Sequence, residues 1–259
     1  MGTPSWRLEL LLDTGSPQLA VTREALNPQN SPSMRLLAKG EDALGRPCVD
    51  FPYRTARPGC AFRPDYLDGN WHEGQYALDL LHLAGAQGRP RSLLQSFAHI
   101  TASRGGDDLA ITLANGIFGL RARERGVPFP PTFLERVFGA AAPVYAICLG
   151  HGGGRISFGR SNAELHRPGA PLLVLRSRAA TVQNPLTMKV SRITLDGKEV
   201  FHAPAMVRGL SRNATFDSGS IGLILPAAVL EALKREFARF CTRAAANCAG
   251  ANGLQNEYR

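Results

Sequence analysis

The sequence predicts a mainly β protein with a few helices. Short apolar runs of strand length recur along the chain and are bounded by turn residues. The 259 residues include 27 glycines and 18 prolines, as expected for a turn-rich globular protein. Helical periodicity stands out in two stretches. Because 44% of the residues are hydrophobic, a packed core is expected, and fibrous and disordered classes are excluded.

The predicted strands begin near the N-terminus and recur to residue 195. Each is a short, mostly apolar run. They are Arg7–Leu12, Tyr76–Ala84, Ile111–Leu120, Val144–Leu149, Arg155–Phe158 and Met188–Leu195. Asp196-Gly197 follows the last run directly and is a turn dipeptide that favours a β-hairpin.

The two helical stretches differ in length. Pro131–Ala140 has Thr132 at a capping position, followed by apolar residues at helical spacing. The second runs from Pro226 to about residue 246. Its apolar residues form one stripe, which predicts an amphipathic helix packed on a sheet. They are Val229, Leu230, Leu233, Phe237, Phe240 and Cys241.

Charge and hydropathy narrow the function classes. The formal net charge is +9, but the arginines are dispersed, and the densest cluster, Arg121, Arg123 and Arg125, is interrupted by Glu124. Without interleaved aromatic residues, this pattern favours a solvated basic surface over a nucleic-acid site. The longest weakly polar stretch, Gly139–Gly150, is shorter than the roughly 20 residues of a membrane-spanning helix.

The cysteines and histidines show no metal-binding spacing. There is no Cys-x-x-Cys and no pair of histidines four residues apart, so we expect no metal and no cofactor. The five cysteines form two locally spaced pairs with one left over, which suits disulfides in an oxidising compartment but also occurs in cytosolic proteins. They are Cys48 and Cys60, Cys241 and Cys248, and the remaining Cys148, for which we expect a buried thiol.

An internal repeat is the most informative feature. Asp13-Thr14-Gly15-Ser16 ends one strand-like run, and Asp217-Ser218-Gly219-Ser220 ends another. One copy alone is explained by turn chemistry, because Asp bonds to its own backbone and Gly adopts a positive φ. Two copies at corresponding positions indicate a duplicated architecture.

Two such loops placed face to face predict a catalytic carboxylate pair. Asp13 and Asp217 would then be unable to ionise together cheaply and would share one proton. The ionised carboxylate takes a proton from water, while the protonated one polarises a carbonyl group. Glycine permits the close approach, and the hydroxyls orient the carboxylates. The predicted supporting residues are Thr14, Gly15, Ser16, Ser218, Gly219 and Ser220.

The order of motifs resembles that of the pepsin-like aspartic peptidases, and the resemblance covers nearly the whole chain. Around the two Asp motifs lie four further segments that are similar to family motifs. They are Gly2-Thr3-Pro4, Asn115–Leu120, Gly153–Gly159 and Leu225-Pro226. The resemblance implies a bilobal acid-protease fold, with an N-terminal lobe over residues 1–159 and a partial C-terminal lobe over 160–259.

The same resemblance implies a flap. In the family, a tyrosine on a β-hairpin closes over the substrate. The segment from Tyr66 to Gly74 looks like this flap, with Tyr66, Gly69 and Trp71 as the expected substrate-binding residues. Cys48 and Cys60 lie just upstream, as do the cysteines of plant and alveolate members such as nepenthesins and plasmepsin V.

The chain departs from the family pattern after the first Asp motif. Family members often have a tryptophan there that supports the flap tyrosine, whereas this chain has the segment 17–21, Pro-Gln-Leu-Ala-Val. Trp71 is expected to supply this support instead, as in beta-secretase-like members. The flap reads Tyr-x-Asp-Gly and not Tyr-Gly-x-Gly, which leaves subsite preference open.

The repeat also predicts a longer protein. Gly116 follows Asp13 by 103 residues, and the same spacing from Asp217 falls near residue 320, beyond Arg259. We therefore expect the sequence to be part of a longer peptidase, truncated at both ends. A signal peptide, pro-segment or membrane anchor would lie outside it, and the expected location is the secretory pathway.

The sequence thus predicts an aspartic endopeptidase that hydrolyses polypeptides bound in an extended conformation. The alternative is a catalytically inactive pepsin-fold protein, a fragment or a binding or inhibitor-like module. Retention of both Asp motifs and of Tyr66 favours the enzyme, whereas an incomplete second lobe favours the alternative. A nucleic-acid binder is a distant third interpretation and is not expected.

Overall fold

The structure, a computed structural model, is mainly β and divides into two compact units. It describes residues 1–49, 60–64, 66, 69–84, 91–104, 114–123, 130–139, 141, 143–150, 153–159, 169, 187–195, 197–202, 213–220 and 222–243. Unit 1 comprises Met1–Leu175, Ala180–Leu186 and Phe216–Ser220, and unit 2 comprises Arg176–Ala179, Thr187–Thr215 and Ile221–Arg259. Asp217 therefore belongs to the same unit as Asp13.

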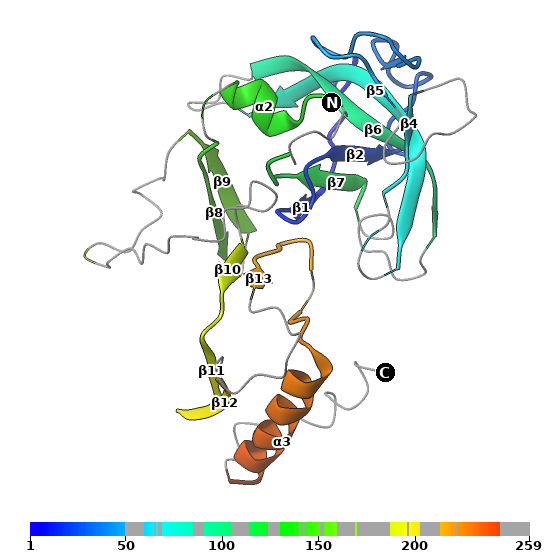
Figure 1. Ribbon diagram of the computed structural model, residues 1–259. Coiled ribbons are helices and arrows are strands. Elements are labelled where there is room, and N and C mark those ends of the chain that lie inside the picture. The colour runs from blue at the N-terminus through cyan, green and yellow to red at the C-terminus, as the bar shows by residue number, and fades with distance from the viewer. Residues whose placement is uncertain are drawn as a thin grey trace. The chain divides into compact units, whose positions relative to one another are not determined.

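Unit 1 is built on a mixed seven-strand sheet (Figure 1). The strand order is β1-β7-β2-β6-β5-β3, and β4 also pairs with β5. β1 pairs with β7 and β2 with β6 in parallel, and the other pairs are antiparallel. The strands are Leu11–Asp13 (β1), Leu19–Thr22 (β2), Arg35–Leu36 (β3), Ala61–Phe62 (β4), Trp71–Leu83 (β5), Arg91–Arg104 (β6) and Gly116–Gly119 (β7).

The two long strands β5 and β6 pair along their whole length, from Trp71 opposite Arg104 to Leu83 opposite Arg91. A register shift lies between Glu73 and Gly74. A Cβ atom at Gly74 would lie 1.9 Å from the carbonyl oxygen of His99, so only glycine allows the two backbones to approach this closely.

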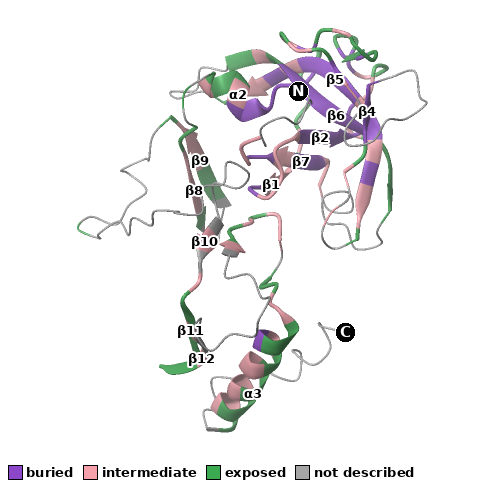
Figure 2. Ribbon diagram, viewed as in Figure 1, coloured by how far each residue is buried: buried purple, intermediate pink, exposed green. Residues whose placement is uncertain are grey.

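Two clusters of buried residues form the core, and Figure 2 shows that burial concentrates in the strands of the seven-strand sheet. Successive side chains of β5 point to opposite faces of the sheet. Tyr76 and Leu78 accordingly belong to the first cluster, together with Phe62, Ala98 and the Cys48–Cys60 disulfide. Ala77 and Leu81 belong to the second cluster, in which Phe133 and Leu134 cover the sheet.

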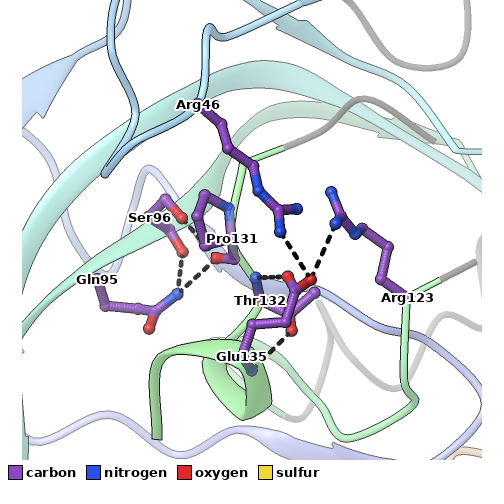
Figure 3. A network of polar contacts seen from close by, with 7 residues as sticks. All are labelled: Arg46, Gln95, Ser96, Arg123, Pro131, Thr132 and Glu135. Carbon is purple, nitrogen blue, oxygen red and sulfur yellow. Dashed lines mark hydrogen bonds and ion pairs between the residues drawn. The ribbon is translucent and has the colours of Figure 1, made fainter. Parts of the chain in front are cut away.

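Helix α2, Phe133–Phe138, begins with a capping box. Glu135 N donates to Thr132 Oγ1 at 3.2 Å, and Thr132 N donates to Glu135 Oε2 at 2.9 Å. The other oxygen of the Glu135 carboxylate pairs with Arg46 at 3.3 Å and Arg123 at 3.0 Å (Figure 3). Ser96 Oγ of β6 donates to the carbonyl oxygen of Pro131 at 2.7 Å, which joins the start of α2 to the sheet.

Smaller elements complete the described part of the chain. β8, Tyr145–Gly150, and β9, Gly153–Phe158, form an antiparallel pair in unit 1. In unit 2, β10 pairs with β13 and β11 pairs with β12. These strands are Thr187–Lys189 (β10), Arg192–Leu195 (β11), Lys198–His202 (β12) and Asn213–Thr215 (β13), and they are followed by helix α3, Ala227–Arg243. No helix among the described residues is long and apolar enough to cross a membrane.

Several predicted elements are confirmed with shifted boundaries. Both helices form, and Thr132 caps the first as expected. The predicted strand Arg7–Leu12 forms only over Leu11–Asp13. The single predicted strand Met188–Leu195 is wrong, because the chain leaves its partner β13 after Lys189 and pairs with β12 from Arg192. Leu195 lies opposite Lys198, as the predicted hairpin requires, although Asp196 lies outside the described residues.

The cysteines follow the expectation in part. Cys48 and Cys60 form a buried disulfide with Cα atoms 5.8 Å apart. Cys241 is disulfide-bonded too, but Cys248 lies outside the described residues, so their pairing stays a prediction. Cys148 is a free thiol, as expected for the unpaired cysteine, but it is half-buried and not buried, because β8 lies in a two-stranded sheet.

Candidate active site

The two Asp motifs occupy loops that meet within unit 1. The first loop continues β1, which pairs in parallel with β7 so that Asp13 lies opposite Gly119. Leu120 N donates to the backbone oxygen of Asp13 at 2.8 Å. The strand of the Asn115–Leu120 segment therefore fixes the backbone at Asp13. The second loop follows β13 and carries Asp217.

Each loop folds back on its own carboxylate in the same way. Gly15 N donates to Asp13 Oδ1 at 2.7 Å, and Ser16 Oγ donates to Asp13 Oδ2 at 2.5 Å. In the second loop, Gly219 N donates to Asp217 Oδ1 at 2.8 Å, and Ser220 Oγ donates to Asp217 Oδ2 at 2.9 Å. Each carboxylate is thus oriented by backbone and hydroxyl donors of its own loop, and Asp13 Oδ1 also accepts from Ser16 N at 3.1 Å.

Four further hydrogen bonds join the two loops through Thr14 and Ser218. Thr14 Oγ1 donates to the Phe216 carbonyl oxygen and accepts from Ser218 N, both at 3.0 Å. Ser218 Oγ donates to the Leu12 carbonyl oxygen at 2.7 Å and accepts from Thr14 N at 3.2 Å. Exchanging the two loops maps this set of bonds onto itself. The loops are therefore held in a reciprocal, two-fold arrangement.

The glycines explain how the loops come so close. A Cβ atom at Gly15 would lie 2.5 Å from Asp217 Cγ, and one at Gly219 would lie 2.7 Å from Asp13 Oδ1. Distances under 3.0 Å are too short for a real Cβ atom, so any larger residue would push the opposing carboxyl group away. Each carboxyl group lies against the glycine of the other loop.

The electrostatics favour a proton on Asp13. The Asp13 side chain is buried, with a residue exposure of 7%. Burial raises the pKa of Asp13 above its usual value, and the charge of Asp217 and a hydrogen bond with it raise it further, against the opposing effect of the Ser16 hydrogen bond. The protonated form of Asp13 is therefore favoured relative to an ordinary exposed carboxyl group.

The predicted flap residues lie in the hairpin between β4 and β5. Tyr66 N donates to the Asn70 carbonyl oxygen at 2.8 Å, and Gly69, with φ at 85°, donates to the Tyr66 carbonyl oxygen at 3.0 Å. Tyr66 packs against the first core cluster, as does Leu11 of β1. Residues 67 and 68 lie outside the described residues.

Trp71 and Tyr66 each have a neighbouring side chain in the structure, and the supporting role expected of Trp71 stays a prediction. The guanidinium of Arg63 lies 4.8 Å from the centre of the Trp71 ring. The buried ring of His72 makes an edge contact with the Tyr66 ring, with centroids 5.0 Å apart. A second residue that sequence reasoning missed is Gln18, whose amide donates to the buried hydroxyl of Tyr76. No sequence motif indicates either contact, because both contacts depend on how the strands pair.

Comparison with known proteins identifies no family for this chain. No protein-family model matches it, and no curated protein gives a significant match. Among the residues that the structure describes, no group of three or more His, Cys, Asp or Glu side chains could hold a metal ion.

Proposed function

We propose that this chain is an aspartic-type endopeptidase that hydrolyses peptide bonds with Asp13 and Asp217. The reciprocal hydrogen bonding of the two loops through Thr14 and Ser218 carries the proposal. Turn formation within one loop does not require hydrogen bonds to a second loop of the same sequence pattern, so these bonds indicate a joint role of the two loops. The raised pKa of Asp13 adds support, because a pair that retains one proton suits acid-base catalysis.

In the proposed reaction, Asp13 carries the shared proton and Asp217 is ionised. Asp217 takes a proton from a water molecule as the water oxygen attacks the peptide carbonyl carbon, and Asp13 gives its proton to the carbonyl oxygen. The resulting gem-diol collapses as Asp217 gives the proton that it took from water to the amide nitrogen, one gem-diol hydroxyl returns a proton to Asp13, and the C–N bond breaks. Both carboxyls are oriented by Gly and Ser donors before substrate arrives, so little reorganisation is needed.

The proposed substrate is a polypeptide in an extended conformation, and the proposed bilobal pepsin-like fold would bind it under the Tyr66 hairpin. The hairpin geometry at Tyr66 and Gly69 supports this role for the segment. The buried Cys48–Cys60 disulfide is consistent with the proposed location in the secretory pathway.

Peptide cleavage by the wild type and by two variants tests the proposal. A library of quenched fluorescent peptides is incubated with each protein from pH 3 to 7, with and without a statine-containing inhibitor. We expect Asp13→Asn and Asp217→Asn each to lose at least about 100-fold in kcat/KM, because neither variant keeps an acid-base pair. The wild-type activity should be inhibited by the statine compound.

Asp42→Asn is the matched control. Asp42 is exposed and accepts a hydrogen bond from Gly45 N at 2.7 Å, which is the same local turn chemistry without a second carboxylate. This variant should cleave at the wild-type rate. Full turnover by either dyad variant would contradict the proposal. Binding of the statine inhibitor without any cleavage by the wild type would favour the inactive binding module instead.

A further inference from the structure

A part-buried polar contact links the first Asp loop to the hairpin that carries Tyr66. Gln18 lies five residues after Asp13, and its side-chain amide donates to the hydroxyl of Tyr76 in β5. Tyr76 is among the largest fully buried side chains of the described residues. Its ring could pack equally well as phenylalanine, so the hydroxyl is present for a directional contact.

Gln18 is a firm anchor for this contact. Its backbone oxygen accepts from Gly119 N at 3.0 Å, at the end of the strand that pairs with β1. A Cβ atom at Gly119 would lie 2.4 Å from Gln18 N, so the two backbones are in close contact. The backbone of Gln18 is therefore held by β7, the same strand that fixes the backbone of Asp13.

On the other side, Tyr76 belongs to the hairpin of Tyr66. β4 and β5 pair as the two strands of this hairpin, Tyr66 N bonds to the Asn70 carbonyl oxygen between them, and β5 includes Tyr76. Phe62 of β4 contacts the Tyr76 ring edge-on, with centroids 5.6 Å apart. Tyr66 packs on the cluster that contains both rings. The nearby Tyr66 phenol also adds to the raised pKa of Tyr76, of which burial is the main cause.

We propose that Gln18 and Tyr76 are positioning residues that hold the Tyr66 hairpin in register with the Asp13 loop. The inference rests on the proposed peptidase function for its catalytic consequence. A directional bond between the half-buried Gln18 amide and the buried Tyr76 phenol allows one hairpin orientation where apolar packing alone allows several.

Three variants test the pair: Tyr76→Phe, Gln18→Leu and the double variant. Tyr145→Phe is the matched control, because Tyr145 is a half-buried tyrosine of β8 outside the proposed site. Two readouts are needed. The first is kcat and KM on the peptide that the wild type cleaves best. The second is acrylamide quenching of Trp71 fluorescence in a Trp6→Phe background, which reports hairpin exposure without any need for activity.

We expect each single variant to lose about tenfold in kcat/KM, mostly in kcat, and the double variant to lose no more than either single one. Quenching of Trp71 should increase in all three, while Tyr145→Phe behaves as the wild type. Wild-type kinetics and quenching in Tyr76→Phe would overturn the inference. A loss of thermal stability with unchanged kinetics and quenching would also overturn the inference. Additive losses of kcat/KM in the double variant would overturn it too.

The two proposals fail separately. If Asp13→Asn is inactive while Tyr76→Phe cleaves normally, the peptidase function stands and the positioning role falls. If no variant and no wild type cleaves any peptide, the function falls, and Trp71 quenching alone decides whether Gln18 and Tyr76 hold the hairpin.

Discussion

At the scale of single residues, the candidate site depends on small side chains at a few positions. Thr14 and Ser218 each supply one hydroxyl that both donates and accepts across the loops. Gly15 and Gly219 leave the space that the opposing carboxyl groups occupy. Larger side chains at these four positions would lose the hydrogen bonds between the loops or displace the carboxyl groups.

His99 in β6 is a second residue with a marked environment. It is buried at 5% exposure, and neither ring nitrogen makes a hydrogen bond with a side chain or backbone group of the described residues. Burial lowers the pKa of His99, against the raising effects of a backbone contact at Leu26 and the charge of Glu24. The folded protein therefore disfavours the charged imidazolium.

This pKa shift predicts how stability changes with pH. Below the unfolded value of about 6.5, the unfolded chain binds a proton at His99 that the folded chain does not, so the free energy of unfolding falls on acidification until the lowered folded pKa is reached. We expect His99→Gln to flatten this fall in urea denaturation measured between pH 7 and 5.

The pKa shift of Asp13 changes stability with pH in the opposite direction, so Asp13 serves as the control for that measurement. Its raised pKa means that the folded chain binds the extra proton below this pKa, which favours folding as pH falls toward the unfolded value of 3.8. Asp13→Asn should remove this gain and leave the His99 fall in place. Identical pH slopes for the wild type and His99→Gln would contradict the assignment.

At the scale of elements, the start of α2 is the best-defined local structure. Thr132 is buried at the cap, and Glu135 closes the capping box while it pairs with Arg46 and Arg123 (Figure 3). The helix is only six residues long. A helix this short has little stability of its own, so its cap and its packing on the sheet decide whether it forms.

Thr132→Ala is expected to lower the free energy of unfolding by about 1 kcal/mol, because the backbone donor Glu135 N loses its acceptor, Thr132 Oγ1. Thr132→Ser keeps the hydroxyl and should lose less than half as much. Glu135→Gln keeps an acceptor for Thr132 N but removes the ion pairs, which are partly exposed and contribute roughly 0–1 kcal/mol. Urea denaturation distinguishes the three, and equal losses in the Ala and Ser variants would show that the cap is not what stabilises α2.

Other elements show where prediction from sequence stops. The strand β6 was not predicted, although it spans Arg91–Arg104. Its buried stretch includes the polar residues Gln95, Ser96 and His99, which obscure the apolar pattern. Gln95 Nε2 and Ser96 Oγ both donate to the carbonyl oxygen of Pro131, 35 or more residues away. A local window of sequence cannot show such a partner.

At the scale of the whole molecule, the two units differ in burial. Both core clusters consist of residues of unit 1. Within the described residues of unit 2, Val229 of α3 is the buried hydrophobic side chain, and the rest of its apolar stripe is half-buried. Local opening is easiest where few apolar contacts must be broken, so the units should differ in stability.

Hydrogen exchange measured by mass spectrometry checks this difference. We expect backbone amides of α3 to exchange at least about tenfold faster than those in the central part of β5 and β6, because α3 can open without disturbing either core cluster. The amides of α2 provide an internal control, since this helix is shorter than α3 but packs in the second cluster. Equal protection of α3 and the β5–β6 pair would contradict the expectation.

The sequence by itself determined the features that depend on neighbouring residues. The two Asp-hydroxyl-Gly-Ser motifs, the Thr132 cap and the Leu195–Lys198 hairpin were all predicted from a few consecutive residues. Turn and cap chemistry is local, so short strings of side chains encode it. The resemblance to pepsin-like peptidases also rests on such strings.

Only the tertiary structure decided which distant groups meet. Thr14 and Ser218 lie 204 residues apart and still bond to each other. The Gln18 contact to Tyr76, the Cys48–Cys60 pairing and the position of His72 beside Tyr66 likewise follow from strand pairing. These contacts depend on which strands of the sheet pair with one another. Strand pairing is decided by the whole unit and not by any single segment.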